Sequence, residues 1–119
     1  MNIEELRAAC LALPHVEEEF PFDQVTLTMR LGKGGKIFAF LPLDADTTMI
    51  SLKMTPENVL ETRAQYPAVQ PGFHLSKKHW NQVIMDGSIS RATLLGWIQD
   101  SYDLIVSSLT KKARAELFE

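Results

Sequence analysis

The residues best suited to chemistry lie in the stretch 66–87, which places aromatic rings, histidines and lysines close together among prolines and glycines. Cationic side chains beside aromatic faces suit the binding of a partner better than the breaking of a bond. An indole also serves as a core anchor in a small domain, so Trp80 has two interpretations. The binding residues predicted here are Lys77, Lys78, His79 and Asn81, and the residues that would line a pocket are Phe73, His74 and Trp80.

A second cationic group surrounds the glycine-rich segment 32–36, which reads Gly-Lys-Gly-Gly-Lys and follows Arg30. Glycine accepts the positive φ of tight turns, so this segment is predicted to be a hairpin tip. It is not a P-loop, because the helix and the closing Lys-Ser/Thr pair of that motif are missing. Its cations are Arg30, Lys33 and Lys36.

Nucleic-acid binding requires several lysine or arginine side chains on one surface, because neutralised phosphates release counterions. We therefore predict binding to double-stranded DNA through both cationic groups, with Asn81 reaching a base edge. The simpler interpretations are a solvated hairpin tip and lysines exposed beside a buried indole. The alternative function is a non-enzymatic protein- or small-ligand-binding module. DNA binding predicts that the two groups share one exposed face, whereas the module predicts a concavity lined by Phe73, His74 and Trp80.

Catalysis and metal binding find weaker support. A nucleophile, a base and an orienting group must converge, but the sequence offers only Ser76 near His79 and His74 near Asp86. We expect no enzymatic activity and no cofactor. The histidines lack zinc-site spacing and there is no second cysteine, so no metal site is predicted. A cation-binding ridge, as opposed to a solvated face, would use Glu4, Glu5, Glu17, Glu18, Glu19 and Asp23.

The 119 residues, 45% hydrophobic and 23% charged, predict one domain over residues 1–119 that folds without disulfides. Cys10 lies in an apolar helical pattern and is expected to be a small buried hydrophobe. Neither a signal peptide nor a membrane-length apolar run is found, so we expect a cytoplasmic location and no membrane association. The sequence does not specify the oligomeric state, for which a monomer is favoured. The formal charge of −3 conceals an uneven distribution, since residues 30–91 carry eight cations against five acids.

Periodicity predicts the elements that position these residues. Asn2 caps a helix that ends before Pro14, and an acidic loop follows over 15–23. Alternating or apolar strands at 25–31, 37–41 and 47–53 form an antiparallel meander. Thr55 caps a helix to about residue 65, and a short strand or turn and then a strand at 80–85 follow. Ser90 caps the last helix, whose carboxyl end carries Lys111, Lys112 and Arg114. The prediction is an α+β fold with helices packed on an antiparallel sheet.

A set of short motifs runs along nearly the whole chain: Pro21-Phe22, Gly-x-Lys-Ile-Phe-Ala ending at Ala39, Leu52-Lys53, Tyr66-Pro67, Pro71-Gly72-Phe73-His74, Lys77-Lys78-His79-Trp80-Asn81, Asp86-Gly87-Ser88 and Ser101-Tyr102. Together these motifs resemble the MmcQ/YjbR family. The resemblance implies a small cytoplasmic bacterial domain with a CyaY-like fold, and DNA binding through a double-wing arrangement of hairpins. Ser76 and Gln82 depart from the residues that many family members carry, which are Asn and Thr.

Overall fold

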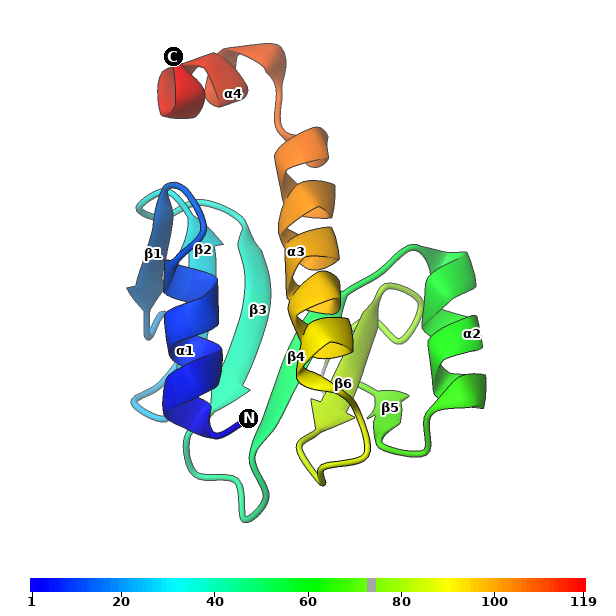
Figure 1. The fold of residues 1–119 in the computed structure, drawn as a ribbon. Coiled ribbons are helices and arrows are strands. Elements are labelled where there is room, and N and C mark those ends of the chain that lie inside the picture. Colours follow the sequence, from blue (N-terminus) through cyan, green and yellow to red (C-terminus); the bar gives the residue numbers. More distant parts are fainter. Residues whose placement is uncertain (73–74) are drawn as a thin grey trace.

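The computed structural model describes residues 1–72 and 75–119, which form a six-stranded antiparallel sheet with helices on one face (Figure 1). The predicted α+β fold is confirmed. The sheet order is β1-β2-β3-β4-β6-β5. The helices are α1 (Ile3–Leu11), α2 (Pro56–Gln65), α3 (Arg91–Ser108) and α4 (Lys111–Phe118). The strands are β1 (Val16–Glu19), β2 (Thr26–Leu31), β3 (Ile37–Pro42), β4 (Met49–Lys53), β5 (Val69–Pro71) and β6 (Trp80–Ile84).

The core lies between the sheet and helices α1 and α3. Alternate residues of each strand turn toward the helices, and the apolar stripe of α3 packs on them with a spacing of three and four residues. Cys10 of α1 is fully buried, as predicted, and burial raises the pKa of its thiol to about 12. No helix in the described residues is long and apolar enough to cross a membrane.

A bulge in β3 fixes how α3 sits on the sheet. Met29 pairs with Ala39 but Arg30 pairs with Ile37, which leaves Phe38 as an extra residue in the strand. Phe38 turns toward the helices, where its ring meets Tyr102 edge-on at 5.5 Å. The buried hydroxyl of Ser101 donates to the Phe38 carbonyl at 2.6 Å. The same hydroxyl accepts from the backbone N–H at the end of β4 at 2.9 Å, so one serine joins α3 to two strands.

Two predicted segments differ from the structure. The expected acidic loop contains β1, because Val16 pairs with Leu31 and because Glu18 and Glu19 find arginine partners in Arg7 and Arg30. These ion pairs offset the repulsion among carboxylates on an edge strand.

The predicted single last helix is in fact two. It ends at Ser108, Leu109 is extended, and the Thr110 hydroxyl accepts from the Ala113 N–H to cap α4. The lysines expected at the carboxyl end of the last helix, Lys111 and Lys112, therefore begin a new one.

Replacing Ser101 tests the link between α3 and the bulge. Ser101→Ala leaves a buried carbonyl and a buried N–H without this partner, so we expect the free energy of unfolding to fall by about 1–3 kcal/mol. Urea denaturation followed by circular dichroism measures this loss. Ser107→Ala is the matched control, since its hydroxyl is exposed and donates only to Leu104 of its own helix. Equal losses in the two variants would contradict this role of Ser101.

Candidate functional site

Strand direction brings the two predicted cationic groups to one end of the sheet. β3 begins at Ile37, β4 ends at Lys53 and β6 begins at Trp80, which pairs with Lys53. Because these strands are antiparallel, the links before β3, after β4 and before β6 lie at the same end. We call this end the basic end, and its lysines are Lys33, Lys36, Lys53, Lys77 and Lys78.

The opposite end of the sheet is acidic. It holds the links 20–25, 43–48 and 85–90, which contain four aspartates and neither lysine nor arginine. The described links 32–36, 54–55 and 75–79 of the basic end contain no aspartate or glutamate. Opposite charges are thus separated along the strands, which the net charge does not reveal. The residues of this acidic end are Asp23, Asp44, Asp46 and Asp86.

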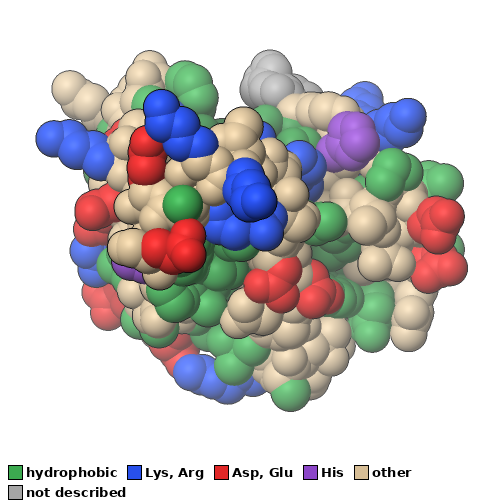
Figure 2. All heavy atoms as spheres, turned by 90° about the horizontal axis from the view of Figure 1, so that it is seen from above, with side chains coloured by type: hydrophobic (Ala, Val, Ile, Leu, Met, Phe, Trp, Pro, Cys, Tyr) green, Lys and Arg blue, Asp and Glu red, His purple; other side chains and the backbone are tan. Residues whose placement is uncertain are grey.

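Helix α4 also lies at the basic end. A Cβ placed on Gly32 would meet the Leu117 side chain at 3.0 Å, and the Phe118 ring packs edge-on against His15 at 4.8 Å. Its cations Lys111, Lys112 and Arg114 therefore lie near the glycine-rich tip. Figure 2 looks down on this end and shows several groups of basic side chains with acidic side chains between them.

The predicted cations differ in their exposure and in whether they are hydrogen-bonded within the protein. Lys33, Lys77 and Lys78 are exposed, and His79 is half-buried beside them. The Lys36 Nζ instead donates to the Ser108 carbonyl and hydroxyl at 3.2 and 3.1 Å, which ties the hairpin to the end of α3.

Arg30 has a structural role rather than the predicted contact with phosphate. Its side chain is only 14% exposed, with Nε 3.3 Å from Glu19 Oε2. Its Nη1 donates to the Gly35 carbonyl at 3.0 Å, and Glu19 accepts from the Gly34 N–H at 2.9 Å. Arg30 and Glu19 therefore hold the shape of the tip that presents Lys33.

The prediction that Asn81 reaches a base edge is wrong. Asn81 is fully buried, and its Oδ1 accepts from Arg63 Nε at 2.6 Å. Its Nδ2 donates to the Val59 carbonyl at 3.2 Å. Arg63 Nη2 donates to the backbone carbonyls of Lys77 and Trp80. Arg63 and Asn81 therefore hold the turn 75–79, which we call the lysine turn, against α2. Sequence reasoning missed Arg63, although the alternation that puts Asn81 in phase with buried Val83 was a signal.

The sheet face opposite the helices carries a pocket of about 670 Å³. Phe73 and His74, predicted to line a pocket, lie outside the described residues. Trp80 lies on this helix-free face, half-buried and edge-on to Phe40 at 5.2 Å, so it supports the pocket without lining it. The lining residues are Phe22, Asp23, Thr26, Phe40, Pro42, Asp44, Ala45, Met49, Ser51, Leu75 and Gln82.

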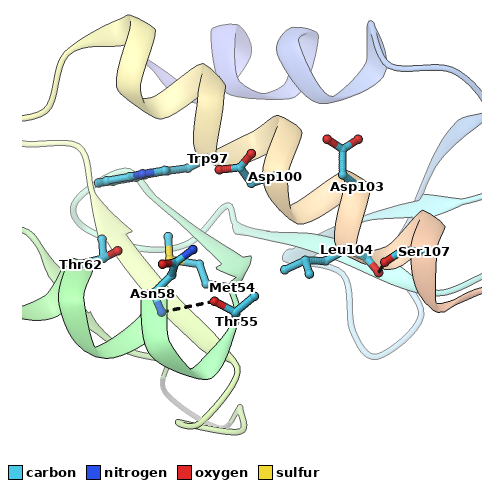
Figure 3. A pocket seen from close by; sticks show the side chains of 9 residues that line it. All are labelled: Met54, Thr55, Asn58, Thr62, Trp97, Asp100, Asp103, Leu104 and Ser107. Carbon is cyan, nitrogen blue, oxygen red and sulfur yellow. Dashed lines mark hydrogen bonds between the residues drawn. The ribbon is translucent and has the colours of Figure 1, made fainter.

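A second cleft, of about 610 Å³, lies between α2 and α3 (Figure 3). Trp97 reaches from α3 toward α2 and packs edge-on against Tyr66 at 5.1 Å. The α2 side presents Thr55, which caps that helix. Asp100 and Asp103 on the α3 side disfavour an anionic ligand there.

The acidic residues near the amino terminus are mostly engaged by arginines. Arg91 donates to Glu5 and lowers the pKa of that carboxyl, and Arg7 does the same to Glu18. Glu19 faces Arg30. Among the described residues, no three His, Cys, Asp or Glu side chains form a group that could hold a metal ion.

A family model and sequence relatives show which family the chain belongs to. The model of the YjbR family matches residues 11–104. The chain belongs to the YjbR family. The relative named Uncharacterized protein YbdF, from Escherichia coli O157:H7, is 36% identical over 109 residues, covering 92% of this chain and 88% of that protein. The relative named Uncharacterized protein YjbR, from Escherichia coli K12, is 29% identical over 119 residues, covering 100% and 99%.

Solved structures show the same fold for this YjbR-family chain. The crystal structure of Deinococcus radiodurans protein DR2400, with a DUF419 domain, has a TM-score of 0.90 and 37% identity, covering 98% of this chain and 87% of that one. A Pseudomonas syringae protein, at 23% identity, has a TM-score of 0.77 and covers 88% of this chain and 99% of that one. The second likeness bears on the fold alone.

Replacing Asn81 distinguishes a structural role from a binding role. Asn81→Ala removes the partner of Arg63 Nε and of the Val59 carbonyl, so we expect the free energy of unfolding to fall by about 2 kcal/mol or more. Chemical denaturation measures this loss. Gln82→Ala, one residue further along β6 and on the helix-free face, is the control and should change stability by less than about 0.5 kcal/mol. An Asn81→Ala protein as stable as the parent would refute the structural assignment.

Proposed function

We propose that this YjbR-family protein binds DNA through phosphate contacts at its basic end, without catalysing a reaction. The observation that carries the proposal is the separation of charge by strand direction. Lys33, Lys77 and Lys78 project from links free of acids, while the links at the far end of the strands carry four aspartates. Such a separation orients the protein in the field of a polyanion and directs the basic end toward it.

The spacing of the lysines suits contact with several phosphates. The glycine-rich tip precedes β3 and the lysine turn precedes β6, with only β4 between them. Two strand spacings amount to roughly 10 Å. Successive nucleotides on one DNA strand rise about 3.4 Å, so the two groups would engage phosphates a few nucleotides apart.

The contacts proposed here differ from those expected from sequence. Arg30 and Asn81 are not among the proposed DNA contacts, because both side chains are hydrogen-bonded within the protein. Lys53 joins it, from the end of β4 between the two groups. With Asn81 removed, the proposed contacts go to phosphates and carry no direct sequence readout. We therefore propose sequence-independent binding of modest affinity.

A salt titration with fluorescently labelled duplex DNA tests this proposal. For the parent protein, log K should fall linearly with log salt concentration. Lys77→Gln combined with Lys78→Gln should weaken binding and make the slope shallower by about 0.9 for each phosphate that is no longer neutralised. Lys33→Gln should weaken binding further. Fluorescence anisotropy at several salt concentrations measures both the affinity and the slope.

A matched variant separates local contacts from net charge. Arg7→Gln combined with Arg91→Gln also removes two positive charges, but from α1 and from the start of α3, away from the basic end. This control should retain most of the affinity. The proposal fails if both double variants weaken binding equally, or if binding by the parent protein does not depend on salt.

A second candidate function is the binding of a small ligand on the helix-free face. It is favoured by the pocket of about 670 Å³, whose walls are mainly apolar and whose floor carries polar side chains. Sites for small molecules commonly combine apolar walls with a few polar groups. Phe73 and His74 lie outside the described residues, so the concavity expected from these residues and Trp80 stays a prediction.

A further inference from the structure

The walls of the helix-free pocket suit a flat ligand. The rings of Phe22 and Phe40 are close to parallel, 18° apart, with centroids at 6.5 Å. Trp80 supports Phe40 from the side at 5.2 Å. Phe22 is 67% exposed, so an aromatic ring stands at the pocket mouth where a flat ligand can stack on it. Met49 and Leu75 add apolar contacts at the edges.

The pocket floor is polar. Ser51 and Gln82 are paired across β4 and β6, and both line the pocket. Neither side chain is hydrogen-bonded to another residue within residues 1–72 and 75–119. A hydroxyl beside an amide offers both donors and acceptors to a ligand edge. A purely apolar ligand would leave these groups unpaired, which disfavours lipids and alkyl chains.

The charges around the pocket indicate how a ligand would lie. The Asp23 carboxylate already accepts hydrogen bonds from the N–H groups of Val25 and Thr26. Asp44 is therefore the pocket carboxylate that remains available to a ligand, on the side of the pocket toward the acidic end. Lys53 follows Ser51 by two residues on the same face, roughly 7 Å along the strand. That separation is about the span of a ribose and its phosphate ester. A ligand with an amino group at one end and a phosphate at the other fits this polarity.

We propose that the pocket binds the base of a nucleotide, stacked on Phe22 and Phe40, with its edge on Ser51 and Gln82 and its phosphate toward Lys53. Bases with an exocyclic amino group are favoured, because this amino group would donate a hydrogen bond to the Asp44 carboxylate. The ligand is either a free nucleotide or an unpaired base in a single strand. The proposal rests on the second candidate function and does not depend on duplex binding.

Calorimetric titration with nucleoside monophosphates tests the proposal. AMP and CMP should bind more tightly than UMP, and ribose 5-phosphate should show no binding. Lys53→Gln should weaken binding of AMP while leaving that of adenosine unchanged, because only AMP carries the phosphate. Absence of AMP binding at about 10 mM, corresponding to a free energy weaker than about −3 kcal/mol, would overturn the proposal.

Two variants test the stacking wall and the floor. Phe40→Leu keeps an apolar side chain but removes the flat face, and it should weaken AMP binding at least about fivefold. Gln82→Ala removes a polar group from the pocket floor without disturbing the core, and it should also weaken AMP binding. Leu60→Ala, exposed on α2, is the control and should bind AMP as the parent does. Unchanged affinity in both pocket variants would overturn the proposal.

Further arms separate the ligand sources and the two functions. Tighter binding of a short single-stranded oligonucleotide than of AMP would support an unpaired base, and equal binding would support a free nucleotide. Lys77→Gln with Lys78→Gln should weaken duplex binding and leave AMP binding intact. Duplex binding without AMP binding would refute the pocket assignment alone. AMP binding without duplex binding would support the pocket and refute the DNA proposal.

Discussion

The direction of the strands is the constraint on which the surface of this protein depends. In an antiparallel sheet, alternate links return to the same end. Links separated by twenty or more residues in sequence therefore lie at the same end of the sheet, as the tip 32–36 and the turn 75–79 do. The sequence places lysines in the links of one end and aspartates in those of the other. The overall charge of −3 averages over this separation and says little about either end.

The exposed cations are held in place by buried or half-buried polar groups that are already paired within the protein. Arg63 and Asn81 fix the lysine turn to α2, and Arg30 with Glu19 fixes the glycine-rich tip. Groups of this kind are costly to leave unpaired, so they stabilise one geometry of the links around them. A buried cation loses its hydration and must be paired within the protein, so it can stabilise the fold but cannot bind a partner. An exposed lysine keeps its charge available for binding.

Much of the fold follows from local patterns in the sequence. Alternation identifies β2, and the Thr55-Pro56 pair marks the start of α2. Local patterns fail where distant residues decide, as in β1, whose glutamates are stabilised by Arg7 and Arg30. The site shows the same limit. Lys77 and Lys78 are recognisable as exposed cations, but the burial of Asn81 depends on Arg63, eighteen residues away in sequence. The pocket on the helix-free face combines residues of four strands with residues of three links, and the sequence carries no local signal for how these segments meet.

The pair formed by Lys53 and Trp80 joins the two candidate sites. Lys53 lies at the basic end, and its register partner Trp80 packs on Phe40, a wall of the pocket. Trp80 thus combines the two interpretations of its sequence context, because it is a packing residue that also supports a binding surface. Side chains on the helix-free face alternate with those of the core, so a shift of one residue in the β4–β6 register would turn Lys53 and Ser51 into the core together. The register that builds the core therefore also sets the distance from the pocket to the nearest cation.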